Sequence, residues 1–121
     1  MPKIVIAEDE HDIRELITFA LRFAGFEVVA TANGEEAWQA AQRESPDLVL
    51  LDVRMPRMNG YEACRQIKAD EKTKDIPVVF LSAKGQESEI RTGLAVGAED
   101  YILKPFEPAL LSERLKEIIG C

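Results

Sequence analysis

Five short apolar segments alternate with five segments of helical character along almost the whole chain. The apolar segments, rich in β-branched and aliphatic residues, cover residues 3–7, 27–31, 48–53, 76–81 and 101–103. Helical patterns follow them at residues 13–21, 37–41, 59–69, 87–96 and 110–119. Parallel strands need a crossover between them, so these repeats predict an α/β fold, a single doubly wound (βα)5 parallel sheet with helices on both faces.

The third apolar segment belongs at the centre of this sheet. Its sequence, Leu48-Val49-Leu50-Leu51-Asp52-Val53, is apolar without alternation except for one carboxylate. Such a pattern is typical of a strand that is covered on both faces. Asp52 is costly to bury near the end of such a strand and needs a compensating partner.

Length and charge limit the classes of protein to which the chain can belong. Its 121 residues, 46% of them hydrophobic, suffice for one core, so we expect a single domain over residues 1–121. The net charge of -7 argues against direct binding to nucleic acid or an anionic membrane, because both need concentrated Lys and Arg. We expect proteins or a small cation as partners.

The sequence contains no run of about 18 apolar residues and no signal-peptide pattern, so we expect a cytoplasmic protein with no membrane-spanning segment. Cys64 and Cys121 are too few and too unpatterned for a disulfide framework or a zinc site. We interpret Cys64 as a small semi-buried residue. Cys121, at the last position, is either a natural end or an added handle.

Polar residues stand at the carboxyl ends of four of the predicted strands: Glu8 with Asp9, then Asp52, Ser82 and Lys104. The strands of a parallel α/β sheet all end at one edge, so these side chains are expected to converge in one crevice. Neighbouring carboxylates repel each other unless a cation neutralises them, and Mg²⁺ prefers oxygen ligands. The set predicts a site that holds a divalent metal ion and a phosphoryl group together.

Each of these residues also has a simpler interpretation. Asp9 can cap the following helix, which would leave Glu8 as a solvated loop charge. Asp52 can bond loop amides, and a single Ser or Lys at a strand end is usually a turn residue or a solvated charge. The joint placement of the residues, rather than any one of them, favours the metal and phosphoryl site.

Longer motifs around these residues resemble a known family. They are Glu8-Asp9, the stretch Asp47–Gly60 with the pattern Asp-x-x-Met-Pro-x-Met-x-Gly, Ser82-Ala83, and the stretch Gly97–Phe106 that ends in Lys-Pro-Phe. Together they resemble the receiver (phosphoacceptor) domain of two-component response regulators over essentially the whole chain. The resemblance implies a flavodoxin-like sheet with strand order 2-1-3-4-5 and a phosphorylation-activated signalling switch. It implies no enzyme activity beyond the domain's own phosphoryl transfer and slow autodephosphorylation.

The resemblance also implies roles for the acidic residues. Asp52 would accept a phosphoryl group from a phosphohistidine of a sensor histidine kinase or phosphotransfer protein. Asp9, Asp52 and the backbone carbonyl of Arg54 would ligate Mg²⁺. Glu8, which stands where Asp is commoner in the family, would act through a bound water.

Three further residues would read out the phosphoryl group. Ser82, where Thr is commoner, would hydrogen-bond it, and Lys104 would pair with it from a strand end held by a cis bond to Pro105. Tyr101 would then swing inward behind Ser82, although by itself it reads as a half-buried strand aromatic. This movement would remodel the face formed by the fourth helix, the fifth strand and the fifth helix.

That face is the expected output surface. We hypothesise that phosphorylation promotes association there with a downstream protein target, a fused effector domain or a second copy. Regulators that dimerise through charged pairs on this face share Arg114, whereas Leu110 stands where they usually carry Glu. The chain fits either a free-standing regulator or the amino-terminal receiver of a longer protein.

Two basic residues flank the expected phosphoryl site, Arg54 two positions after Asp52 and Lys84 two positions after Ser82. We expect them to alter the lifetime of the phosphoryl group, with the sign of the change left open. Arg54 also bears on a rival class, the haloacid-dehalogenase-type phosphatases, which need a second Asp there as general acid. Flavin binding is disfavoured because Glu8-Asp9-Glu10 would repel the flavin phosphate.

Overall fold

Within the described residues, 1–83 and 85–120, the computed structural model has one sheet of five parallel strands in the order β2-β1-β3-β4-β5. The strands are β1 (Lys3–Ala7), β2 (Glu27–Thr31), β3 (Leu48–Asp52), β4 (Val78–Ser82) and β5 (Asp100–Leu103). In register, Ala7 pairs with Thr31 and with Leu51, and Ser82 pairs with Leu103. The strands therefore end together at one edge, which confirms the expected fold and strand order.

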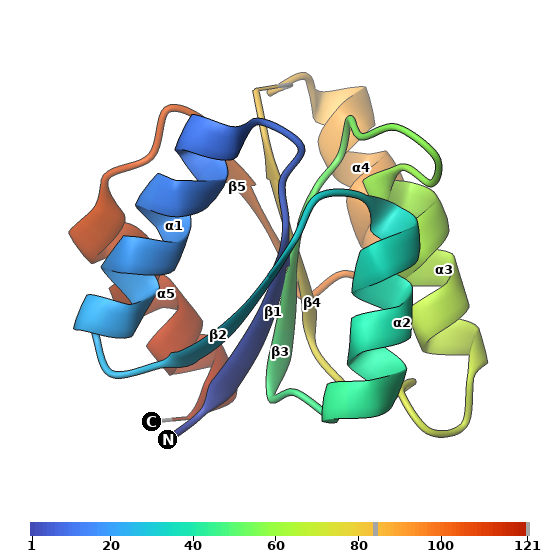
Figure 1. Ribbon diagram of the computed structural model, residues 1–121. Coiled ribbons are helices and arrows are strands. Elements are labelled where there is room, and N and C mark those ends of the chain that lie inside the picture. The colour runs from blue at the N-terminus through green and yellow to red at the C-terminus, as the bar shows by residue number, and fades with distance from the viewer. Residues whose placement is uncertain (84, 121) are drawn as a thin grey trace.

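Helices cover both faces of this sheet (Figure 1). On one face lie α1 (His11–Phe23) and α5 (Pro108–Ile119), and on the other lie α2 (Gly34–Glu44), α3 (Gly60–Ala69) and α4 (Glu87–Ala95). None of the helices in residues 1–83 and 85–120 has both the length and the apolar content needed to cross a membrane. Lys84 and Cys121, both singled out from the sequence, lie outside the described residues.

Each face of the sheet has its own apolar core, and β3 contributes to both. Val49 and Leu51 belong to the core under α2 and α3, whereas Leu48 and Leu50 belong to the core under α1 and α5. All positions of β3 are buried, as its lack of alternation predicts. Asp52 therefore ends a strand that is buried along its whole length.

Two glycines bring the starts of α2 and α3 close to the end of β3. A Cβ atom at Gly60 would collide with the carbonyl oxygen of Asp52, and one at Gly34 would collide with the carbonyl oxygen of Met58. Asn59 begins α3 by accepting a hydrogen bond from the Glu62 amide at 2.9 Å, while the Glu62 side chain bonds back to the Asn59 amide. The loop that follows Asp52 is thus held tightly against the sheet.

The structure departs from the sequence predictions at a few positions. β4 begins at Val78 rather than Ile76, because Pro77 has no N–H to donate and the Ile76 carbonyl accepts from the Lys68 ammonium at 2.7 Å. The apolar pattern of residues 110–119 predicts Leu110 and Leu111 on one side of the last helix, but Leu110 is 60% exposed whereas Leu111 is buried. Cys64 is fully buried rather than semi-buried, and this burial raises the pKa of its thiol to about 11.

Candidate functional site

The polar residues predicted at the strand ends line one cleft outside the carboxyl edge of the sheet. The cleft has a volume of about 270 Å³ and is lined by Glu8, Asp9, Glu10, Asp52, Arg54, Ser82, Ala83 and Lys104. Asp52 and Ser82 are the last residues of β3 and β4, and the other lining residues come from the segments that follow β1, β3, β4 and β5. The parallel order of the strands is what brings together residues that are up to 96 positions apart.

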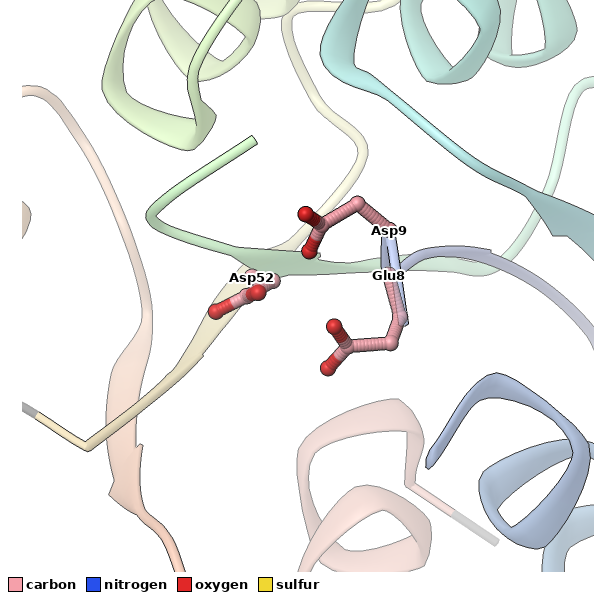
Figure 2. A group of neighbouring side chains, drawn as sticks. All are labelled: Glu8, Asp9 and Asp52. Carbon is pink, nitrogen blue, oxygen red and sulfur yellow. The ribbon is translucent and has the colours of Figure 1, made fainter. Parts of the chain in front are cut away.

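Three carboxylates form the acidic part of the cleft (Figure 2). One oxygen atom from each of Glu8, Asp9 and Asp52 lies within 4.8 Å of the other two. Glu8 is 1% exposed and Asp52 is 8% exposed, whereas Asp9 is open to solvent. Hard oxygen donors in this number suit a hard divalent cation, so the three residues fit a metal site.

The loop between β1 and α1 holds Glu8 and Asp9 in place. The Glu8 amide donates to the Thr31 carbonyl at 3.1 Å, and Glu8 Oε2 accepts from the Glu10 amide at 3.2 Å. The N-cap of α1 is Glu10, and its side chain makes no capping hydrogen bond. Asp9 therefore does not cap this helix, and its carboxylate is left to face Asp52 in the cleft.

Arg14, which the sequence analysis missed, steadies the same loop from α1. Its Nη1 atom donates to the Glu8 carbonyl at 2.8 Å and lies 3.4 Å from the Asp9 carbonyl. Side chains in a helix lean toward its amino-terminal end, so an Arg in the first turn is placed to reach back to the preceding loop. The place of Arg14 in the first turn of α1 was the only feature of the sequence that indicated this contact.

Lys104 is the less exposed of the two basic residues, Lys104 and Arg54, in the described lining of the cleft. Its Nζ atom lies 2.6 Å from Glu8 Oε1 and 3.6 Å from Asp52 Oδ1. The Lys104 amide donates to the Ser82 carbonyl at 2.8 Å, which joins the ends of β4 and β5. The peptide bond to Pro105 is cis, as expected. Among the described residues that line the cleft, the acidic side chains of Glu8, Asp9, Glu10 and Asp52 thus outnumber the basic side chains of Lys104 and Arg54.

Burial and the neighbouring charges shift the pKa values of two cleft residues, Asp52 and Lys104. Burial, followed by the negative charge of Glu8, raises the pKa of Asp52 to about 7, although Lys104 opposes the shift. Burial alone would lower the pKa of Lys104, but its hydrogen bond to Glu8 and the charge of Asp52 raise it overall. A bound divalent cation would favour the ionised form of Asp52.

Ser82 lines the cleft, whereas Tyr101 does not. Ser82 is 2% exposed and lines the cleft beside Asp52. Tyr101 is half-buried on β5 and pairs in register with Phe80 of β4, with the two ring centroids 6.0 Å apart. Tyr101 is not among the residues that line the cleft, so the structure brings Ser82 to the acidic cluster and leaves Tyr101 behind it.

A second hollow of about 550 Å³ adjoins the cleft and shares Asp9 and Arg54 with it. Tyr61 and Glu89 lie on its far side. The Tyr61 hydroxyl donates to Glu89 Oε2 at 2.9 Å, which joins the start of α3 to the first turn of α4. The sequence analysis did not identify this pair, because the residues are 28 positions apart and neither stands at a strand end.

Comparison with known proteins agrees with this geometry. The family model of the response regulator receiver domain matches residues 4–116. The phosphate regulon transcriptional regulatory protein PhoB of Pseudomonas aeruginosa is 46% identical over 116 residues, which are 96% of this chain and 51% of that protein. PhoB of Rhizobium meliloti is 40% identical over 98% of this chain and 52% of its own length. The chain spans about half the length of these curated relatives.

Solved structures show the same fold. A response regulator of Chloroflexus aurantiacus has a TM-score of 0.93 and 37% identity, covering 99% of this chain and 98% of the other. The receiver domain of a sensor histidine kinase of Pseudomonas aeruginosa has a TM-score of 0.92 and 33% identity over the same shares of the two chains. That second structure carries a magnesium ion coordinated in its active-site cleft.

The fold and the cleft define a flavodoxin-like α/β domain with a carboxylate-rich site that could bind a divalent metal ion. The chain belongs to the response regulator receiver domain family of two-component systems. Receiver domains are signalling switches rather than enzymes in the usual sense, and they interact with histidine kinases and effectors.

Proposed function

We propose that residues 1–121 form one receiver domain in which Asp52 accepts a phosphoryl group from a phosphohistidine of a sensor kinase or phosphotransfer protein. One observation carries this proposal: the carboxylates of Glu8, Asp9 and Asp52 converge within 4.8 Å, with Lys104 Nζ 3.6 Å from Asp52. A nucleophilic carboxylate beside a metal site and a fixed ammonium is an arrangement suited to phosphoryl transfer.

In this proposal, Glu8, Asp9, Asp52 and the backbone carbonyl of Arg54 hold Mg²⁺. When bound, Mg²⁺ neutralises the carboxylates and the oxygens of the incoming phosphoryl group. The ionised Asp52 attacks phosphorus, the bond between phosphorus and the donor imidazole breaks, and the imidazole leaves with the electron pair of that bond. Because the pKa of Asp52 is raised to about 7 without metal, a bound cation would increase the ionised, nucleophilic fraction of Asp52 at neutral pH.

The remaining residues stabilise and report the product. Lys104 shifts from Glu8 toward a phosphoryl oxygen, and Ser82 donates its hydroxyl to another. Tyr101 then turns inward behind Ser82 and changes the α4-β5-α5 face, where a partner, an effector domain or a second copy associates. Because the relatives named PhoB are transcriptional regulators of about twice this length, a fused effector is the output we favour. A free-standing regulator in the cytoplasm is the alternative.

A phosphatase of the haloacid-dehalogenase type is disfavoured. Such an enzyme needs a carboxylic acid two residues after the nucleophile to protonate the leaving group, and Arg54 stands there, exposed at the cleft. We therefore propose only slow autodephosphorylation, with a rate that Arg54 alters. Comparing the dephosphorylation rates of the wild type and Arg54→Ala tests this effect.

The central test is the intact mass of the protein after incubation with Mg²⁺ and acetyl phosphate. Wild type and the control Asp12→Asn, which neutralises an exposed carboxylate on α1, are expected to gain one phosphoryl group. Asp52→Asn, or EDTA in place of Mg²⁺, should abolish the gain. An adduct that persists in Asp52→Asn, or that is absent from the wild type, would contradict the assignment.

A further inference from the structure

The helix α4 is weakly attached to the rest of the described molecule. Gly93 is its one buried residue, and its N-cap residue Gln86 makes no side-chain capping bond. Leu94 is 46% exposed, so α4 buries little apolar surface of its own. Elements with few buried contacts open or shift at low free-energy cost. Each polar contact that α4 makes therefore counts for a large share of what holds it in place.

At Gly93, α4 rests directly on the aromatic rings of the sheet. A Cβ atom at Gly93 would lie 2.8 Å from Tyr101 Cδ2 and 3.0 Å from Phe80 Cδ2, so no space for a methyl group remains between the helix and these rings. Tyr101 cannot change position under α4 without a matching displacement of the helix, because packed contacts have little free volume. The position of α4 and the position of Tyr101 are therefore coupled.

Tyr61 connects α4 and Tyr101 to the loop that carries the candidate site. Its hydroxyl donates to Glu89 Oε2 at 2.9 Å and also lies 3.2 Å from the Glu89 carbonyl. Its ring meets Phe80 edge to face, with centroids 5.1 Å apart. Burial, and then hydrogen bonds with Tyr101 and Glu89, raise the pKa of Tyr61 above its usual range.

The backbone of Tyr61 is held from the other direction. It follows Gly60, whose amide donates to the Val53 carbonyl at 2.9 Å and whose Cα packs on the carbonyl of Asp52. Tyr61 also lines the hollow that reaches Asp9 and Arg54. It therefore connects the immobile loop after Asp52 with the weakly attached helix.

We propose that Tyr61 is a positioning residue that holds α4 in the position it has before phosphorylation. The hydrogen bond from Tyr61 to Glu89 must break before Tyr101 can turn inward. This inference rests on the proposed function and adds a restraint on the same switch. A ligand that favours the shifted state has to overcome whatever stabilises the resting one. Removing the restraint should therefore make the protein respond to phosphorylation more readily.

The test uses beryllofluoride with Mg²⁺ as a phosphoryl mimic and measures its apparent affinity. Tyr61→Phe keeps the ring on Phe80 and removes only the hydroxyl, so it should bind about three- to tenfold more tightly than the wild type. Glu89→Gln keeps an oxygen acceptor but removes its charge, which weakens the hydrogen bond from Tyr61, so it should change the affinity in the same direction by a smaller factor. The double variant should gain no more than Tyr61→Phe alone, because Glu89→Gln acts through the Tyr61 hydroxyl that Tyr61→Phe already removes.

Glu87→Gln is the matched control, since it neutralises another carboxylate in the first turn of α4 and should leave the affinity unchanged. Thermal unfolding of each variant separates loss of stability from gain of response. Wild-type affinity in Tyr61→Phe, or additive effects in the double variant, would overturn this inference alone. A wild type that takes up no beryllofluoride would overturn the proposed function and this inference with it.

Discussion

Lys104 and Glu8 form an ion pair of 2.6 Å in which the Lys104 and Glu8 side chains are 17% and 2% exposed. The same ammonium lies a further ångström away from Asp52, at 3.6 Å. The ammonium of Lys104 is therefore paired more closely with Glu8 than with Asp52. The pairing keeps the cation in the cleft and leaves the Asp52 carboxylate available.

Replacing Lys104 should destabilise the metal-free protein. Lys104→Met leaves the buried carboxylate of Glu8 without its ammonium partner, so in EDTA at pH 8 the free energy of unfolding should fall by about 1–3 kcal/mol. Urea denaturation measures the change, and Mg²⁺ should recover part of it. Lys74→Met, which removes a partner of the exposed Glu71, should cost about 0–1 kcal/mol. Equal losses in the two variants would show that the buried pair is no different from a surface pair.

Asp52 should make stability depend on pH. The pKa of Asp52 is raised from 3.8 to about 7 on folding, so its stabilising contribution is full below pH 4 and is lost as pH rises through 7. In EDTA, Asp52→Asn should therefore be more stable than the wild type at pH 8, by on the order of 1–3 kcal/mol. The difference should shrink toward pH 5, as followed by urea denaturation. A difference that grows toward acid pH would contradict the direction of the shift.

Asp9 should contribute to metal binding without contributing to stability. It is exposed and does not cap α1, so Asp9→Asn should leave unfolding in EDTA nearly unchanged. Its carboxylate shares the metal site with Glu8 and Asp52, so the Mg²⁺ dissociation constant should rise at least about tenfold. Calorimetric titration with Mg²⁺ measures this, with Asp12→Asn as the control. Equal Mg²⁺ affinity in both variants would remove Asp9 from the site.

Gly60 should be intolerant of any side chain. Gly60→Ala places a methyl group against the carbonyl oxygen of Asp52, so unfolding should become easier by about 1–3 kcal/mol or more. Gly85→Ala is the matched control, since its added methyl meets only the flexible end of Leu103 at 3.3 Å. Thermal denaturation compares the two variants. Equal stability would mean that the loop after Asp52 yields more easily than its packing implies.

The sequence predicts the fold and most of the cleft because one rule connects them. Parallel strands end at a common edge, so Glu8, Asp52 and Lys104 had to meet there once the five strands were identified. The motifs then indicated the family, which the match over residues 4–116 confirms. The roles of the individual residues in phosphoryl transfer stay predictions.

Side-chain contacts between distant elements could not be predicted in this way. Tyr61 and Glu89 meet only because α3 and α4 lie side by side on one face, and no periodicity carries that information. The preference of Lys104 for Glu8 over Asp52 depends on differences of one ångström. The exposure of Leu110 depends on how α5 is rotated about its axis against the sheet.

The burial of β3 on both faces divides the molecule by stiffness. Amide hydrogens of Leu48–Asp52 should exchange with solvent only on global unfolding, whereas those of Glu87–Ala95 should exchange through local opening, since Gly93 is the one buried residue of that helix. The proposed phosphorylation of Asp52 would therefore act at the end of a strand that is buried on both faces. We expect the resulting displacement to appear in α4, which has the fewest buried residues of the five helices in the described part of the chain.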